Sequence, residues 1–237
     1  MARYSKILGP DEKPIDLDAL YGEPKAGPTI AGVRSPISGH PADGLTPSRL
    51  GGILRAADQG DPLAYYELAE DMEERDLHYA GVLGTRKRQV SQIPVKVEAA
   101  SDEKEHEAHA DFVREWLDSK VLAGALFDML DAIAKGFSIT EVSWSSRVGA
   151  VTPSALTWRT PRWFGLDDIS LDEPQLYEAD GNRAPLDMNS YVVHRHKAKS
   201  GLTIRSGLAR VVSWAWMYKA FTLRDWALFT QNYGMPI

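Results

Sequence analysis

Two pairs of histidines are the first residues whose spacing suggests chemistry. His106 and His109 stand three residues apart in an acidic stretch, whereas the zinc-protease pattern needs histidines four residues apart on one helical face. His194 and His196 share one face of a predicted strand, but no nearby aspartate or glutamate completes a triad or a metal site. We therefore interpret the first pair as part of a solvated helix and the second as a basic strand edge. The sequence predicts no metal site.

Glu141 is the most enzyme-like carboxylate, because it falls in the alternating apolar segment FSITEVSWSS at residues 137–146. A carboxylate in such surroundings has a raised pKa, as the acid or base of a hydrolase requires. The alternative is a structural ion pair with a neighbouring arginine. The phosphate-loop patterns GxxxxGK[ST] and GxGxxG and the nucleophile motif GxSxG are absent. We predict a non-enzymatic protein with no catalytic residue and no cofactor.

A basic stretch near the end of the chain suggests contact with an anion. Residues 190–237 carry seven Lys and Arg but one Asp, Asp225, although the whole chain has a formal net charge of −6. Four of the cations lie in the segment HRHKAKSGLTIR: Arg195, Lys197, Lys199 and Arg205. Cations on a loop can contact phosphates without reading bases, so any DNA contact is expected to be independent of sequence. An ordinary solvated loop and a patch that balances an acidic neighbouring subunit remain alternatives.

The last segment, from Ser206 to about Asn232, is predicted to form one helix that is apolar on nearly all sides. A surface helix needs a single apolar stripe, but this one distributes aromatic residues over several sides: Trp214, Trp216, Phe221, Trp226 and Phe229. Leaving them in water would expose a patch larger than monomers usually show. We predict that this helix packs against other subunits or further segments. Its charged residues leave no uncharged stretch of about 18 residues, so we predict no membrane span.

The remaining elements predict an α+β fold. Seven of the 14 prolines fall in residues 1–47, and we predict an extended or disordered arm over residues 1–45. Helices are predicted at 46–58, 61–76, 76–92, 102–119 and 122–136, and strands at 93–99, 137–146, 155–160, 175–179 and 190–196. The basic run at residues 86–88 is expected either to pair with the preceding acidic helix or to form a solvated face.

The ordered series of segments resembles the portal proteins of Mu-like tailed bacteriophages. The matching segments are GLTPSRLGGILRAADQGDPLAYYELAEDMEERDLHYAGVLGTRKRQV, LFDMLDAIAKGFSITEVSW, YVVHRHKAKSG and WALFTQNYGMPI. No single tetrapeptide is decisive, but the order and separation of the whole series are specific. The resemblance runs through nearly the whole chain after the arm.

The resemblance implies a structural subunit of a ring, typically of twelve copies, at one vertex of the virion, assembled in the bacterial host cytoplasm. Such a ring passes double-stranded DNA during packaging and ejection. It docks the terminase motor and contacts the major capsid and head-completion proteins, with no membrane involved. Arg195, Lys197, Lys199 and Arg205 would then contact DNA or the motor, and the five aromatic residues of the last helix would pack subunits or stem helices together.

The same resemblance implies helical wing segments, a strand-rich clip-like region and a long aromatic stem-type helix. Residues 46–147 would form an α/β wing and the start of the stem, 148–204 the clip-like region, and 205–237 a stem-type helix that is incomplete at its C-terminus. Family members continue for roughly as long again, so the chain is expected to be truncated.

Two rival functions remain open from the residues themselves. A monomeric, sequence-independent DNA-binding adaptor would show steep salt dependence as a single chain. A hydrolase that uses Glu141 would need a pocket and a strongly raised pKa at that carboxyl.

Overall fold

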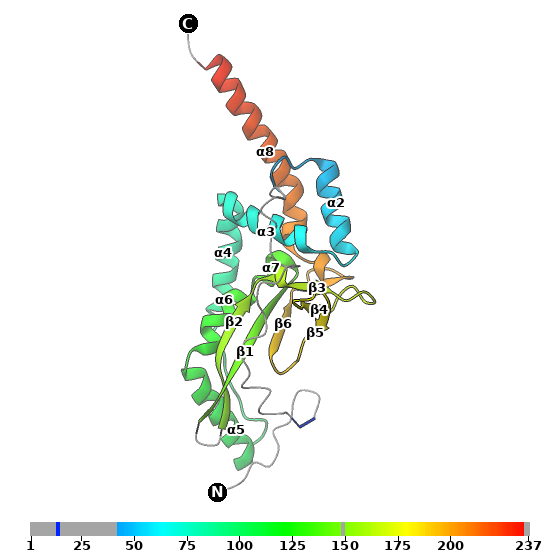
Figure 1. Cartoon of the computed structure of the whole chain (residues 1–237). Helices are drawn as coiled ribbons and strands as arrows, with labels where there is room; N and C mark the ends of the chain where they lie inside the picture. Colours follow the sequence, from blue (N-terminus) through cyan, green and yellow to red (C-terminus); the bar gives the residue numbers. More distant parts are fainter. Residues whose placement is uncertain (1–12, 15–41, 148–149, 235–237) are drawn as a thin grey trace.

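The computed structural model of this chain describes residues 13–14, 42–147 and 150–234. Helices gather at one end of the molecule, and a long β-hairpin flanked by further helices extends toward the other end (Figure 1). The arm predicted for residues 1–45 falls almost entirely outside the described residues. The fold is therefore of the mixed α+β type, as the sequence predicts.

Two of the first three helices begin at a residue whose side chain caps the first turn. Helix α2 (Pro47–Asp58) follows Thr46, whose hydroxyl accepts a hydrogen bond from a backbone N–H of the first turn at 3.2 Å. Helix α3 (Leu63–Arg75) ends at Asp76. The Asp76 carboxylate then accepts hydrogen bonds from two backbone N–H groups, at 3.0 and 3.1 Å, and so caps α4 (Leu77–Ser91).

The next helices differ in part from the prediction. Helix α5 (Lys104–Asp118) confirms the charged helix, but the single apolar helix predicted at 122–136 is wrong. It is divided into α6 (Val121–Met129) and α7 (Ala132–Lys135). The last carbonyl groups of a helix have no hydrogen-bond partner within the helix. At the end of α6, the carbonyl of Met129 accepts a hydrogen bond from the hydroxyl of Ser138.

Two small antiparallel sheets follow the helices. In the first sheet the order is β2-β1-β6, and in the second it is β3-β4-β5. The strands are β1 (Phe137–Arg147), β2 (Ala150–Arg159), β3 (Phe164–Leu166), β4 (Pro174–Tyr177), β5 (Arg183–Pro185) and β6 (Tyr191–Arg195). The longest predicted strand, at 137–146, is thus the central strand of the larger sheet, and the short β3 and β5 were not predicted.

The strand predicted at residues 93–99 is wrong. The segment has no strand partner among the described residues, and the side chains of Ile93 and Val95 are exposed. The carbonyl of Val97 instead accepts two guanidinium hydrogen bonds from Arg114 of α5, at 3.1 and 2.8 Å. Alternation makes the backbone extended, but a strand also needs a neighbouring strand.

The core forms where α2, α3 and the final helix α8 (Leu208–Tyr233) meet β1. Tyr65 and Tyr66 of α3 are almost fully buried, and the ring of Tyr66 meets that of Phe137 edge to face, with centroids 5.7 Å apart. Met217 of α8 belongs to the same core. The first half of α8 is therefore anchored to the helical end of the molecule.

Glycine is required where the start of α8 crosses α7. A Cβ atom at Gly207 would lie 2.4 Å from the carbonyl oxygen of Ala134, which is closer than atoms can approach. Gly136 has a positive φ of 103°, and a Cβ there would lie 2.4 Å from the carbonyl oxygen of Thr203. These two glycines let the α7–β1 junction and the entry to α8 pack backbone against backbone.

A buried network of charges joins the helices to one another. Lys135 is 3% exposed, and its Nζ lies 2.7 Å from Asp131 Oδ2, 3.6 Å from Glu73 Oε1 and 4.0 Å from Glu70 Oε1. The other oxygen of Asp131 lies 3.7 Å from Nζ of Lys87. Lys87 of the basic run therefore lies in the interior, and its direct partner is Asp131 rather than the acidic helix α3. Glu70 and Glu73 of α3 join the network through Lys135.

Candidate nucleic-acid and subunit interfaces

The basic segment at residues 194–205 connects β6 to the start of α8. The N–H of His196 donates to the carbonyl of Gly136 at 2.8 Å and so extends the pairing of β6 with β1. Farther on, the Asp172 carboxylate accepts the backbone N–H of Thr203 at 2.5 Å and its hydroxyl at 3.1 Å. The segment is thus fixed at both ends, and its middle, residues 197–201, is exposed.

The four predicted cations lie in different electrostatic surroundings. Arg195 forms an ion pair with Glu173, with Nη2 2.5 Å from Oε2, and Arg205 lies 3.9 Å from Asp58. Lys197 and Lys199 are exposed and have no carboxylate partner within the part of the chain that the structure describes. The structure therefore leaves these two lysines as the cations of the segment that are most available to an anionic partner.

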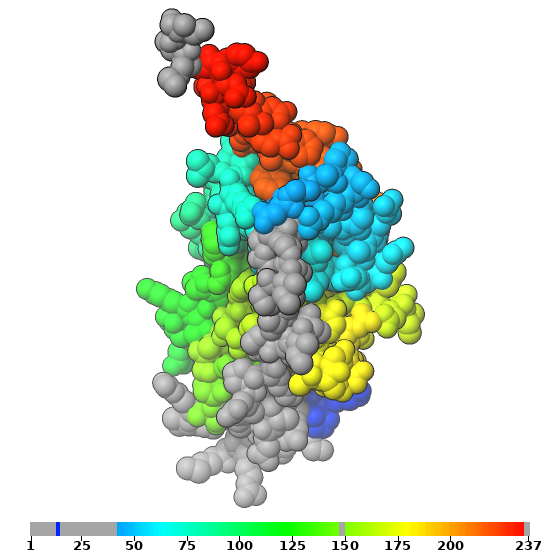
Figure 2. All heavy atoms as spheres, turned by 45° about the horizontal axis from the view of Figure 1, so that its top comes forward, coloured from blue at the N-terminus to red at the C-terminus, as the bar shows by residue number. Residues whose placement is uncertain are grey.

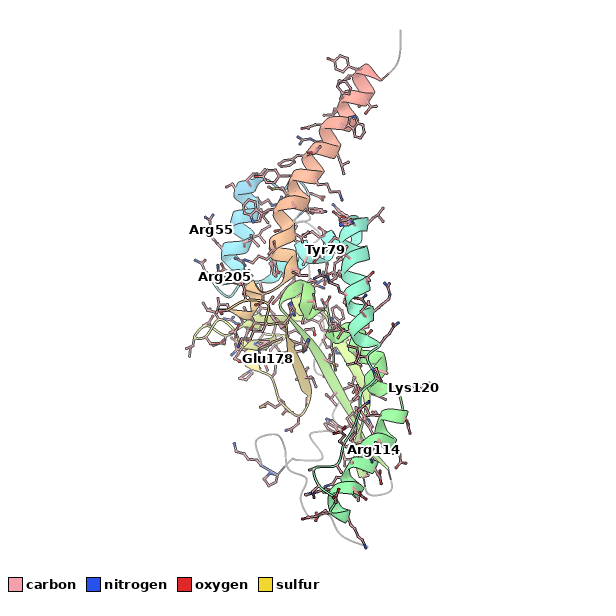
Figure 3. All side chains as sticks on the ribbon, turned by 180° about the vertical axis from the view of Figure 1, so that it is seen from behind. Arg55, Tyr79, Arg114, Lys120, Glu178 and Arg205 are labelled. Atoms are coloured by element: carbon pink, nitrogen blue, oxygen red, sulfur yellow. The ribbon has the colours of Figure 1, made fainter. Side chains whose placement is uncertain are left out.

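Arg55 is a neighbouring cation that the sequence analysis missed. It is exposed in the last turn of α2, and Figure 3 shows it on the same side of the molecule as Arg205. Helix α2 contacts the short 3₁₀ turn Thr203–Arg205, which explains this proximity. No sequence signal could have joined Arg55 to residues 194–205, because about 140 residues separate them and only the packing of α2 brings them together.

The two halves of α8 have different surroundings. In the first half Ala209, Ser213 and Met217 are buried, and Arg210 Nη2 lies 2.7 Å from Asp58 Oδ2 of α2. Lys219 Nζ then lies 2.9 Å from Asp76 Oδ2 at the start of α4. From Thr222 to Tyr233 every residue is exposed, and this half stands clear of the remaining atoms (Figure 2).

The five predicted packing residues divide between these halves. Trp216 and Phe221 are partly buried against the core, and Trp214 is 37% exposed. Trp226 and Phe229 are 68% and 58% exposed, and among the described aromatic rings that of Phe229 meets the ring of Tyr233 one turn later, at 5.3 Å between centroids. Trp216 and Phe221 therefore serve the fold of this chain, whereas Trp226 and Phe229 present large apolar surfaces to solvent.

Glu141 adopts the structural alternative that the sequence left open. Its Oε2 accepts a hydrogen bond from Nε of Arg159 at 2.7 Å, and its Oε1 accepts one from the hydroxyl of Tyr191 at 3.2 Å. Both carboxylate oxygens are therefore occupied by neighbouring strands, which suits a buried ion pair better than a working acid or base. Burial, reinforced by the charge of Glu141, raises the pKa of Tyr191 well above its usual value.

The histidines likewise have local partners. The ring of His106 lies 2.7 Å from the hydroxyl of Ser101, at the start of the acidic helix α5. Burial and the adjacent His196 lower the pKa of His194, which favours its neutral form. Across the described residues, no group of three or more potential ligand side chains is arranged to hold a metal ion.

Among the described residues, the second half of α8 is apolar and exposed, while the buried Lys135 and Glu141 are held in ion pairs. This combination is typical of a structural subunit that makes further contacts through its long helix. The comparisons with known proteins identify the class. The family described as the portal protein of Mu bacteriophage matches residues 66–237, and the chain belongs to this family of structural, non-enzymatic proteins.

Two relatives support this assignment. The chain is 32% identical over 234 residues to the portal protein of Escherichia phage Mu and 35% identical over 204 residues to Mu-like prophage FluMu protein gp29 of Haemophilus influenzae. These alignments include 98% and 84% of this chain but only 45% and 39% of the respective relatives. The chain thus spans less than half the length of either relative. Within its described residues, no helix, α8 included, combines the length and apolarity needed to cross a bilayer.

Proposed function

We propose that the chain forms part of a portal subunit, which assembles into a ring and provides the channel for double-stranded DNA during packaging and ejection. The same proposal includes a ring of twelve copies at the virion vertex. It also includes docking of the terminase motor and contacts with the major capsid and head-completion proteins. The observation that carries it is the exposed second half of α8, which lies inside the family match and has no partner among the described residues.

The elements suggest a place for each part of such a subunit. In this proposal residues 46–147 form the wing and the start of the stem, the strand-rich residues 148–204 form a clip-like region, and residues 205–237, which include α8, form a stem-type helix. In this arrangement Trp226 and Phe229 would be covered by stem helices of neighbouring subunits. Burying a large side chain contributes about 1.5–3 kcal/mol, so these two residues would favour assembly substantially.

Contact with DNA in this proposal is weak and independent of sequence. A conduit must let DNA slide, so tight phosphate binding along its length would oppose its function. Only Lys197 and Lys199 among the four predicted cations are free of carboxylate partners within the described residues, which suits transient contact. Replacing Arg195, Lys197 and Lys199 together by alanine should impair packaging or motor docking, and normal packaging and docking would contradict the assignment.

Ring formation can be tested by exchange of the matched segment. In the portal protein of Escherichia phage Mu, the segment that aligns with this chain would be replaced by this chain, and the product examined by negative-stain imaging and light scattering. We expect rings with a central hole wide enough for duplex DNA, about 20 Å or more. The variant with Trp226→Ser and Phe229→Ser should lose rings, and Trp214→Ser, on the anchored half of α8, is the matched control. A monomeric chimera that is folded by circular dichroism would contradict the proposal.

A DNA-binding adaptor remains the second candidate, favoured by the exposed Lys197, Lys199 and Arg55. Each phosphate that the protein no longer neutralises reduces the slope of log K against log salt concentration by about 0.9. If the isolated chain binds duplex DNA tightly, and Lys197→Ala with Lys199→Ala lowers this slope by about 2, the adaptor function is favoured. A portal segment predicts weak binding by single chains.

A further inference from the structure

The connection between β3 and β4 holds an apolar side chain at the surface of the molecule. Ile169 in this connection is 97% exposed, more than any other large apolar residue of the described chain. The Asp167 carboxylate accepts hydrogen bonds from four backbone N–H groups of the connection, at distances of 2.7 to 3.3 Å. Leu171, which has a positive φ of 57°, places its side chain beside Gly60, just after α2. The connection is therefore pre-formed, and little conformational entropy would be lost when a partner contacts Ile169.

The same connection is acidic. Residues 167–173, DDISLDE, contain four carboxylates and no cation. Arg183 forms an ion pair with Asp168. Arg195 forms one with Glu173, so two of the four negative charges remain uncompensated by these arginines. The side chains of Asp168 and Glu173 are still 82% and 67% exposed. The connection thus presents its apolar tip on an acidic surface.

A hollow of complementary character lies on the outer face of α4. It has a volume of about 500 Å³ and is lined by seven residues between Leu77 and Gln89. Leu77 is 92% exposed. Apart from its own helix backbone, no atom of the described chain lies within 4 Å of the place that a Cβ at Gly81 would take. Arg86 and His78 belong to the described lining, which contains no carboxylate. The hollow therefore combines an apolar wall, open space above a glycine and positive charge.

These two surfaces lie on opposite sides of one copy. Figure 1 shows α4 along one side, whereas the β3–β4 connection lies on the other side, beside the end of α2, and the view from behind in Figure 3 agrees. A copy therefore cannot insert Ile169 into its own hollow. Contact between two different surfaces of neighbouring copies is heterologous, and such contacts generate rings when the rotation closes. A symmetric dimer would instead place the acidic connection against itself, which the like charges oppose.

A ring needs more contact than the exposed half of α8 supplies. That half, from Thr222 to Tyr233, is roughly 18 Å long, and one face of it covers about 300 Å². Stable interfaces bury about 800 Å² on each partner. A second pair of complementary surfaces is therefore required. Arg86 is exposed and has no carboxylate within ion-pair distance in the described part of the chain, so it is available to the acidic connection of a neighbour.

We propose that Ile169 of one copy inserts into the α4 hollow of the neighbouring copy, where it covers Gly81 and packs against Leu77. The carboxylates beside Ile169 then face Arg86. This contact rests on the proposed ring and names the surfaces that close it in addition to α8.

Disulfide formation tests this contact, because the protein contains no cysteine. Ile169→Cys and Gly81→Cys would be combined in the chimeric portal protein described above, with any cysteines of the remaining Mu segments replaced by serine. Because each copy would be linked to both neighbours, non-reducing electrophoresis of the rings should show a ladder of linked subunits. Each single variant should remain unlinked. So should Ile169→Cys with Gly124→Cys, the matched control, since Gly124 is also an exposed helical glycine with open space at its Cβ position.

The outcomes separate this contact from ring formation. Rings without a ladder would overturn the contact and leave the ring, as expected if the remainder of the portal chain or another virion protein covers the hollow. Linked dimers of Ile169→Cys alone would also overturn the contact, because they indicate a symmetric arrangement. A chimera without cysteine substitutions that forms no rings would contradict the proposed function itself, and this contact with it.

Filling the hollow provides a test without cysteine variants. Gly81→Leu should leave the single chain at least as stable, because the side chain enters open space, but should remove rings by occupying the place of Ile169. Gly124→Leu should preserve rings. Arg86→Glu should lower the fraction of subunits in rings several-fold, and adding Asp168→Lys should restore it, because the charges are exchanged. Rings that tolerate Gly81→Leu, or a loss of rings that Asp168→Lys does not restore, would contradict the proposal.

Discussion

Replacing Lys135 by methionine should destabilise the fold by about 3–5 kcal/mol at neutral pH. The buried network contains three carboxylates, those of Glu70, Glu73 and Asp131, and three cations, including Arg162, whose Nε lies 3.6 Å from Glu70 Oε2. Methionine fills the space of the lysine stem but removes the cation that lies within 4.0 Å of all three carboxylates. The interior is then left with one uncompensated negative charge, and breaking a buried pair in this way has the stated cost.

The loss of stability caused by Lys135→Met should depend on pH, because burial shifts the pKa values of the neighbouring carboxylates. Burial raises the pKa of Glu70 and of Glu73 above the ordinary value of 4.5, while the charge of Lys135 opposes that rise. The folded state therefore binds more protons than the unfolded state between pH 4.5 and the raised pKa, so these groups reduce stability as pH rises through that window. Without Lys135 both pKa values rise further, and protonation can relieve the unpaired charge. The deficit of the variant should be smaller near pH 5 than at neutral pH.

Urea denaturation of the variant and the parent chain at neutral pH and at about pH 5 measures both effects. Lys104→Met, at an exposed position in the first turn of α5, is the matched control and should change stability by no more than about 0.5 kcal/mol. A loss below about 1 kcal/mol for Lys135→Met, or an equal loss at both pH values, would refute the view that this network is a buried and balanced set of charges.

Three backbone positions give further predictions, each measurable by urea denaturation. Gly207→Ala should destabilise the chain by more than about 2 kcal/mol, because the new Cβ would lie 2.4 Å from the carbonyl oxygen of Ala134; a loss under about 0.5 kcal/mol would contradict this. Gly81→Ala, in the exposed middle of α4 with no atom within 4 Å of the new Cβ, should instead stabilise by about 0.5–1 kcal/mol. Lys120 has a φ of 60°, a left-handed conformation that is unfavourable for residues with a Cβ atom. Lys120→Gly should therefore leave stability unchanged or raise it by up to about 1 kcal/mol, and a marked loss of stability would contradict backbone strain at this position.

Local patterns predicted most helices and the central strand but not which extended segments pair. The segments at 93–99 and 137–146 alternate in the same way, yet only the second pairs, because β2 and β6 flank it on both sides. The first is exposed and is bound by Arg114 of α5 instead. Alternation specifies an extended backbone, whereas pairing depends on contacts between residues far apart in sequence. The short β3 and β5 were missed for the same reason, since three residues contain too little pattern to detect.

The sequence predicted which cations lie in the candidate interface but not which of them form ion pairs. The sequence shows four cations between residues 194 and 205, but it does not show that Glu173 pairs with Arg195 or that Asp58 lies near Arg205. Those partners come from β4 and α2, which only the tertiary fold brings close. Similarly, the buried position of Lys87 depends on Asp131 of the α6–α7 turn, 44 residues later. Charge runs in a sequence thus indicate which residues are present, and the fold decides which charges remain available.

Helix α8 shows how one uniform sequence pattern can serve two purposes. Aromatic residues recur along the helix from Trp214 to Tyr233. Among the described elements, however, α2, α3 and α7 contact only the first half of the helix. Ion pairs of Arg210 with Asp58 and of Lys219 with Asp76 fix the anchored half, and the last of them lies just before the exposed half begins. The exposed aromatic residues contribute little to the stability of this chain, because their apolar surface stays in water. This apolar surface lies on a helix that is already folded and anchored by its first half. Packing a further helix against it would therefore cost little additional conformational entropy, which favours such a contact.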